Sequence, residues 1–170
     1  GLSRLDDALI EARQLLALDP QSGGAKRLLA AIYMAMSAYD RALEIYEPLL
    51  VSDANRAGTW MSYGHALKTL NRTREGIAAY RQAIELAPQL GEAYWSLANL
   101  KTVTFSEADM AQMKAQAARA DIGAEDKVNF LFALGKAAED RRETEAAFAY
   151  YSEGAALHLS VSNYTTGRLD

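Results

Sequence analysis

Aromatic, amide and cationic side chains recur in the sequence at the spacing of one helical turn. Asn99 follows Trp95 after four residues, and Lys136 follows Phe132 after four residues. Residues four apart lie on one face of a helix, and aromatic rings together with cations are typical of binding hot spots. The rings could hold apolar side chains of an extended peptide, the amide could bond to its backbone, and the cations could hold its carboxylates. The candidate set is Arg27, Met61, His65, Lys68, Trp95, Asn99, Phe132 and Lys136.

Residue patterns that make or break bonds are missing from the sequence. The chain has no cysteine, which excludes thiolate zinc sites and cysteine nucleophiles, and its 2 histidines argue against an all-histidine metal site. Neither G-x-x-x-x-G-K-[ST] nor G-x-G-x-x-G occurs. We interpret His65 as a polar groove residue and the run Glu139–Glu145 as a solvated turn. The sequence therefore predicts no catalytic residue, no metal and no cofactor.

The composition argues against nucleic acid and membranes as partners. Lys and Arg number 18 against 22 Asp and Glu, a formal net charge of −4, whereas proteins that bind polyanions carry a basic footprint. No apolar run reaches the roughly 20 residues that a membrane span needs, and no signal peptide is recognisable. We expect a cytoplasmic protein.

The elements that must position the candidate side chains are helices that repeat along the chain. Laid over itself, the sequence shows a 34-residue period in which Ala30 matches Gly64 and Tyr46 matches Tyr80. The small residues let two helices approach closely. No segment alternates like a strand, and the patterns predict about nine helices.

This period resembles the tetratricopeptide repeat, a helix–turn–helix unit. Five residues fall on the signature positions of that family: Trp60, Gly64, Tyr80, Ala83 and Pro88. The resemblance implies an all-α superhelix, a solenoid of stacked units. We expect a half unit at 1–22, full units at 23–56, 57–90, 91–127 and 128–161, and a tail or linker at 162–170.

In such a superhelix the first helix of each unit lines a concave groove. The eight candidate residues lie at the fifth, ninth or twelfth positions of the units, which form the stripe that faces the groove. Tyr94 takes a packing position, whereas Trp95 faces the groove. We expect a protein or peptide there, although docking of a further domain or filling of the groove floor stays open. A clamp for a C-terminal carboxylate, which some members of the family have, is not expected, because its Asn position holds Ala31.

The third unit, 91–127, is irregular. It has 37 residues, and the patch Val103–Phe105 stands where earlier units have a short polar turn. Ser106 is a good N-cap for a restarted helix, Gly123 is expected to be a left-handed cap residue, and Asp126 falls in the next first turn. A tolerated insertion is the alternative to a functional role.

A more specific resemblance covers residues 57–160. The segments Ser96–Thr102 and Phe132–Asp140 are similar to the last two repeats of bacterial proteins that join tetratricopeptide repeats to a sulfotransferase domain. The resemblance implies an accessory scaffold, with the missing C-terminal domain as a further partner. The alternative is a part of the enzyme that shapes or presents the substrate. No strand and phosphate-cradling loop for the sulfate donor occurs in these residues, so we expect no catalysis by them.

Both ends of the array carry apolar residues where a solenoid needs a polar cap. They are Leu2, Leu5 and Ile10 at one end, and Leu157, Leu159 and Tyr164 at the other. We expect a homodimer through an array end.

Overall fold

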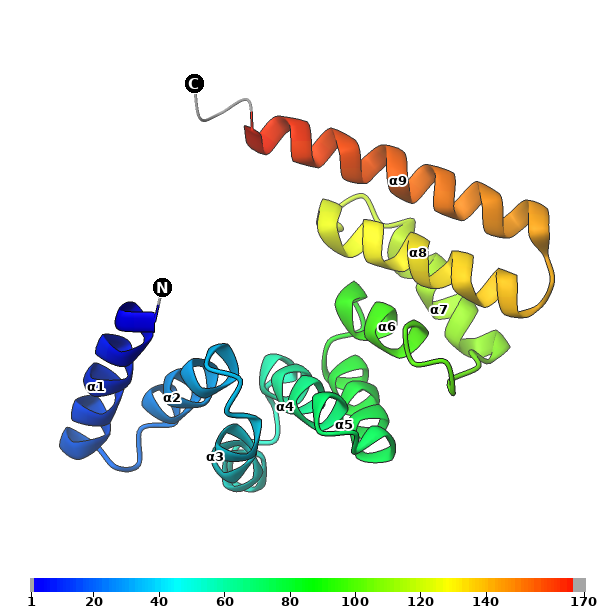
Figure 1. Ribbon diagram of the computed structural model, residues 1–170. Coiled ribbons are helices and arrows are strands. Elements are labelled where there is room, and N and C mark those ends of the chain that lie inside the picture. Colours follow the sequence, from blue (N-terminus) through cyan, green and yellow to red (C-terminus); the bar gives the residue numbers. More distant parts are fainter. Residues whose placement is uncertain (1, 167–170) are drawn as a thin grey trace. The chain divides into compact units, whose positions relative to one another are not determined.

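The fold is built from helices alone. The computed structural model describes the backbone from residue 2 to 166 and the side chains from residue 4 to 163. Within that range there are nine helices and no strand (Figure 1), which confirms the expected all-α class. The helices are α1 (Leu2–Leu18), α2 (Gly23–Ala35), α3 (Tyr39–Ser52), α4 (Ala57–Thr69), α5 (Thr73–Leu86), α6 (Gly91–Ala98), α7 (Glu107–Ala117), α8 (Ala124–Asp140) and α9 (Thr144–Thr166).

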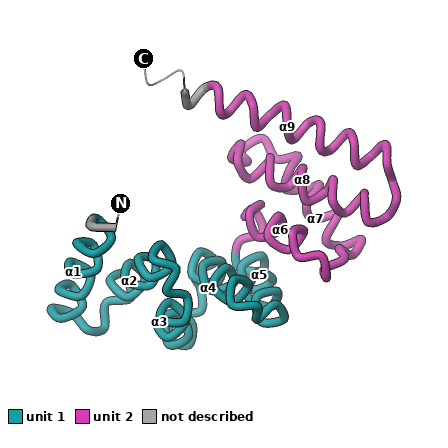
Figure 2. The backbone as a smooth tube through the Cα atoms, viewed as in Figure 1, with its two compact units in different colours: residues 1–86 teal, residues 87–170 magenta. Residues whose placement is uncertain are grey.

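The chain forms two compact units, coloured separately in Figure 2. Unit 1 comprises residues 1–86 with α1 to α5, and unit 2 comprises residues 87–170 with α6 to α9. In unit 1, α2 packs against α1 and α3, and α4 packs against α3 and α5. In unit 2, α8 packs against α6, α7 and α9. Each unit is thus held together by helices that are close in the sequence.

The helices follow the expected period. The first helices α2, α4, α6 and α8 begin 34, 34 and 33 residues apart. Because α8 begins at Ala124, before the expected boundary at 128, residues 124–127 form an additional turn at the start of α8. Gly123 is the N-cap of α8, with φ −63° and ψ 144°, so the prediction of a left-handed residue there is wrong. Asp126 lies in the first turn of α8, as expected.

Left-handed residues end the first helix in three of the repeats. Ser37, Asn71 and Arg142 have φ values of 59°, 62° and 62° and follow α2, α4 and α8. After each, a backbone N–H bonds to a carbonyl five residues back, as Arg72 does to Leu67 at 2.9 Å. This is the Schellman pattern that satisfies the last carbonyls of a helix.

The third unit breaks this pattern at Phe105, one period after Asn71. Phe105 is buried, with its ring centroid 6.2 Å from that of Tyr94, and α6 ends after only 8 residues. The chain restarts as α7, where Ser106 Oγ accepts from the Asp109 N–H and Asp109 Oδ2 accepts from the Ser106 N–H. This capping box confirms Ser106 as an N-cap. The irregular segment therefore has a packing role, since Phe105 fills the core where other units turn.

Glycine opposite tyrosine sets the spacing of the two helices within a repeat. A Cβ on Gly64 of α4 would lie 2.7 Å from the Tyr80 ring of α5, and one on Gly135 of α8 would lie 2.6 Å from the Tyr151 ring of α9. Real Cβ atoms do not approach a ring so closely, so a larger residue would push the helices apart.

The start of α6 is fixed by the first turn of α8. The Gly91 N–H donates to Asp126 Oδ1 at 2.9 Å, which places a carboxylate at the positive end of α6. A Cβ on Gly91 would lie 2.3 Å from the Asp126 carbonyl oxygen. Glycine therefore lets the two helices touch, and this contact sets where Trp95 and Asn99 lie in unit 2.

The last helix, α9, has 23 residues and continues to Thr166, past the expected unit boundary at 161. Among the described residues no helix combines the length and the apolar character needed to cross a membrane. Of the apolar end residues, Ile10 is 54% exposed and Leu159 is 62% exposed. The side chains of Leu2 and Tyr164 lie outside the described residues.

Candidate binding surface

Three aromatic rings form a row across α6, α8 and α9 in unit 2. The ring centroids of Trp95 and Phe132 lie 5.6 Å apart, and those of Phe132 and Tyr151 lie 6.4 Å apart. All three side chains are half-buried, so each keeps some open surface. We call these three residues the aromatic row. The structure thus brings two of the expected groove residues into contact and adds a third ring.

The aromatic row is supported by fully buried rings and by glycine. Tyr94 is 0% exposed, with its centroid 5.5 Å from that of the equally buried Phe130, which confirms the packing position expected for Tyr94. Because successive helix residues point in different directions, burial of Tyr94 leaves Trp95 at the border of the core. A Cβ on Gly154 of α9 would lie 2.9 Å from the Phe132 ring. The rings are therefore held in place by close contacts on the buried side.

Two polar side chains flank the aromatic row, each one helical turn beyond a ring. Asn99 is exposed at the C-terminal end of α6, and within the described part of the chain its side chain has no hydrogen-bond partner. Lys136 forms an ion pair with Asp140, four residues farther along α8. The Lys136 charge is consequently already balanced, which weakens its expected role as a contact for a ligand carboxylate.

The hydroxyl of Tyr151 is also engaged. It donates to Glu139 Oε2 at 3.1 Å. The pKa of Tyr151 is raised to about 12, mainly because the hydroxyl is partly buried and secondly because it bonds to the Glu139 carboxylate. Tyr151 thus stays protonated near neutral pH, and the carboxylates of Glu139 and Asp140 give this side of the aromatic row an acidic character.

The candidate residues of α4 in unit 1 differ in how far they reach the surface. Met61 is only 5% exposed, because α4 packs against α2, α3 and α5. This corrects the expectation that Met61 faces an open groove. His65 is half-buried, with Nδ1 2.9 Å from the Tyr80 hydroxyl oxygen. Lys68 is exposed and makes no ion pair with any described residue.

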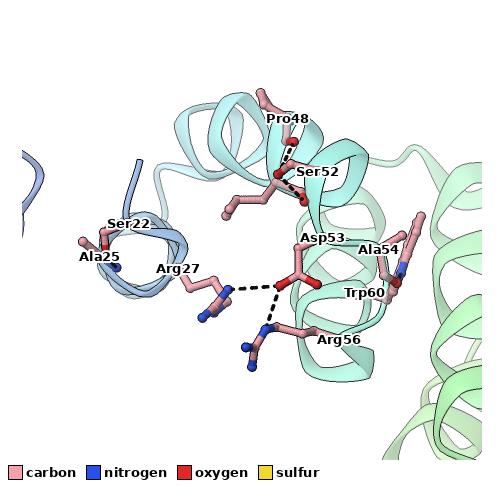
Figure 3. A network of polar contacts seen from close by, with 10 residues as sticks. Ser22, Ala25, Arg27, Pro48, Ser52, Asp53, Ala54, Arg56 and Trp60 are labelled. Atoms are coloured by element: carbon pink, nitrogen blue, oxygen red, sulfur yellow. Dashed lines mark hydrogen bonds and ion pairs between the residues drawn. The ribbon is translucent and has the colours of Figure 1, made fainter. Parts of the chain in front are cut away.

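Arg27 of α2 belongs to a charge network between α3 and α4. Figure 3 shows Arg27 and Arg56 directed at the carboxylate of Asp53, with Arg27 Nη1 3.8 Å and Arg56 Nε 2.8 Å from Asp53 Oδ2. Beside it, the Trp60 indole N–H donates to the Ala54 carbonyl at 2.8 Å. Arg27 is therefore occupied by an internal carboxylate, and a ligand would have to compete with Asp53.

Sequence reasoning missed three residues that shape the surface. Tyr151 is not among the candidate residues, and its contact with Phe132 depends on Gly154 being small. Asp140 lies four residues after Lys136, a spacing that predicts an ion pair on a helix. Asp53 lies in a turn between helices, where the pattern gives no sign of the Arg27 contact.

Comparison with known proteins supports the fold. Residues 57–90 match the family model described as the tetratricopeptide repeat. MamA, known from a crystal structure, is 18% identical in sequence to this chain. The match covers 94% of this chain and 92% of the MamA chain, with a TM-score of 0.70. YrrB, described as a TPR protein with an unusual peptide-binding site, is 18% identical. The match covers 92% of this chain and 79% of the YrrB chain, with a TM-score of 0.64. PilW, described as a type IV pilus biogenesis factor, is 20% identical. The match covers 81% of this chain and 63% of the PilW chain, with a TM-score of 0.64.

No curated protein sequence matches the chain. At these identities the structural likeness concerns the fold, and it confirms the expected tetratricopeptide-repeat solenoid. The matched family and these three structures do not concern sulfotransferases, so that resemblance stays a prediction.

Proposed function

We propose that this chain is a protein- or peptide-binding scaffold and that the aromatic row of unit 2 is its anchor site. The contact between Trp95 and Phe132, with centroids 5.6 Å apart and both side chains half-buried, carries this proposal. Partly open aromatic rings offer apolar area that an incoming side chain can cover, and such rings dominate binding energy in many interfaces. Stacked repeats commonly bind partners on the surface that their helices form.

The groups around the aromatic row favour an apolar or aromatic anchor over an acidic one. Asn99 can donate to and accept from a peptide backbone without breaking an internal side-chain bond. Lys136 is paired with Asp140, and Glu139 adds a second carboxylate close by. A ligand carboxylate would therefore meet more negative than positive charge here.

Recognition on this surface requires no bond to be made or broken. The Phe132 ring is held against Gly154, and the Tyr151 ring is held against Gly135. Because the rings are already fixed by these contacts, little side-chain freedom is lost when a partner binds, and this loss is a main cost of binding.

In unit 1 we propose Lys68 as a contact for an acidic group of a partner. It is exposed and lacks an ion-pair partner among the described residues, whereas Arg27 already faces Asp53. His65 is held near Tyr80 and would contribute through its remaining open surface.

The test begins with a random-peptide phage library selected on the immobilised chain. The affinity of a selected peptide is then measured by fluorescence anisotropy for the wild type and for two variants. Trp95→Ala should weaken binding about 30-fold or more, the loss typical of an aromatic hot spot. Asn99→Ala should weaken binding about 3- to 10-fold, as expected for one hydrogen bond.

Phe148→Ala is the matched control, because Phe148 is an aromatic residue of the same unit that is 73% exposed and lies outside the aromatic row. Its affinity for the peptide should equal that of the wild type. The proposal is rejected if no peptide is selected, or if Trp95→Ala and Phe148→Ala bind the peptide equally well.

We further propose that this surface serves a sulfotransferase-like protein. Asn99 lies within Ser96–Thr102, and Phe132 and Lys136 lie within Phe132–Asp140, the two segments that resemble such fusions. The aromatic row would then hold either the catalytic domain or part of its substrate. A coding sequence that continues into a strand, a phosphate-cradling loop and a helix would support this role. A coding sequence without them would contradict it, and these 170 residues alone should transfer no sulfate.

A further inference from the structure

The side of α9 that faces away from α8 carries two large apolar side chains with two small uncharged ones between them. Ala147 and Gly154 are buried on the inner side. The residues at the spacing i, i+4, i+7 and i+11 on the other side are all exposed, with Phe148 at 73% and Leu159 at 62%. We call this set the outer face of α9: Phe148, Ser152, Ala155 and Leu159.

Part of the same face is covered in unit 1. Tyr46 and Tyr151 occupy equivalent positions, so Phe148 and Ala155 of α9 correspond to Leu43 and Leu50 of α3. Leu43 is 4% exposed and Leu50 is 7% exposed, and Leu43 belongs to a cluster with α4 residues. The outer face of α9 thus has the position of a packing face, while no described helix covers it.

The charge pattern distinguishes α9 from α3. At the positions of Ala149 and Ser152 in α9, α3 has Glu44 and Glu47, which are both exposed. The one charged residue between 146 and 163 is Glu153, which is paired with Lys127 of α8 at 3.9 Å. A second uncharged helix can therefore approach this face without leaving a charge unpaired and buried.

We propose that the outer face of α9 binds a second copy of the chain, with the two α9 helices antiparallel about a two-fold axis. The spacings of four, three and four residues read the same in both directions. An antiparallel copy therefore sets Phe148 against the partner's Leu159, and Ser152 against the partner's Ala155. The large side chains lie at the ends and the small ones at the centre, so the helices can approach closely there. A two-fold contact needs such self-complementarity.

The contact is small, which predicts a weak dimer. The face extends over about three helical turns, about 17 Å of helix. A single helix face of that length buries less area than the roughly 800 Å² per partner of a standard interface. We therefore expect a monomer–dimer equilibrium that depends on protein concentration in the micromolar to hundred-micromolar range. This inference does not depend on the proposed peptide site, because the outer face of α9 and the aromatic row share no residue.

Sedimentation equilibrium of the 170-residue chain over that concentration range is the first test. The wild type should approach twice the monomer mass at the highest concentration, and Phe148→Glu should stay monomeric, with a dissociation constant raised at least about 30-fold. Val51→Glu is the control, because Val51 is an aliphatic residue of α3 that is 89% exposed. It should dimerise like the wild type.

The absence of cysteine from the chain allows a second test. In the antiparallel pair, Ser152 and its symmetry mate are offset by three residues, about 4.5 Å along the axis. With helix axes about 8 Å apart, the two Cα atoms lie about 6 Å apart, within the range that a disulfide spans. Ser152→Cys should therefore form a disulfide-linked dimer under mild oxidation much faster than Val51→Cys does.

The two tests separate the proposal from other contacts. A wild-type chain that remains monomeric, together with equal cross-linking of Ser152→Cys and Val51→Cys, overturns it. Dimers that survive Phe148→Glu but are lost in Ile10→Glu also overturn it, because they would form through α1. Circular dichroism of each variant shows whether the helices are intact.

Discussion

Replacement of Gly91 by alanine should destabilise unit 2, although alanine favours helices. Gly91 is the first residue of α6, and its new Cβ would lie 2.3 Å from the Asp126 carbonyl oxygen and 3.0 Å from two further backbone atoms of that residue. Backbone atoms cannot turn aside as a long side chain can. The start of α6 must therefore move away from α8, and the bond from the Gly91 N–H to Asp126 Oδ1 is lost.

The magnitude follows from three contributions. Overpacking costs about 1–3 kcal/mol, and loss of a hydrogen bond to a carboxylate costs about 1.5–3 kcal/mol. The smaller freedom of alanine in the unfolded chain returns about 0.4–1 kcal/mol. We expect a net loss of about 2–5 kcal/mol in the free energy of unfolding.

Gly58→Ala is the matched control. Gly58 lies in the first turn of α4, is exposed, and has nothing within 4 Å of an added Cβ. This variant should gain up to about 1 kcal/mol. Urea unfolding followed by circular dichroism gives both values, and hydrogen exchange shows whether the loss in Gly91→Ala is centred on α6 and the start of α8. Equal stability of Gly91→Ala and Gly58→Ala would refute the close contact of α6 with α8.

Three further predictions concern a cap, a turn and a titration. Ser106→Ala should remove the capping box of α7 and lower the free energy of unfolding by about 1 kcal/mol in urea titrations, and an unchanged midpoint would contradict the cap. Arg142→Gly should raise the thermal midpoint, since a non-glycine residue in the left-handed region costs about 1–2 kcal/mol, whereas Asn71→Gly should change it less because Asn tolerates this region. The pKa of Tyr151 is raised to about 12 in the folded chain, so its contribution to stability is complete below pH 10 and is lost as the pH rises from about 10 to about 12. Tyr151→Phe should therefore show a shallower fall of stability over that range in pH-dependent urea titrations, and an identical slope would contradict the pKa.

The fold could be predicted because its determinants are local or periodic. Ser106 and Asp109 signal a helix start by themselves. Gly64 and Tyr80 recur as Gly135 and Tyr151, and each pair packs two helices together. The backbone conformation of Gly123 was mispredicted. A glycine between helices can serve as either an extended N-cap or a left-handed C-cap, and the sequence alone does not decide between them.

The candidate surface could be predicted only in part. The four-residue spacing and the repeat register put Trp95 beside Phe132, since both hold the fifth position of adjacent units. The burial of Met61 could not be read from that register, because it depends on how closely neighbouring helices pack around α4. The partner of Arg27 could not be read either, because Asp53 lies in a turn outside the helical pattern.

The central claim is that the aromatic row holds a bound peptide, and indole N–H signals in ¹H–¹⁵N spectra test it most directly. The chain has 2 tryptophans, and the Trp60 indole already donates to the Ala54 carbonyl in unit 1. Titration with a library-selected peptide should shift the Trp95 indole signal, assigned with Trp60→Phe, and should leave the Trp60 signal in place. A peptide that binds while the Trp95 signal stays unchanged would contradict the account.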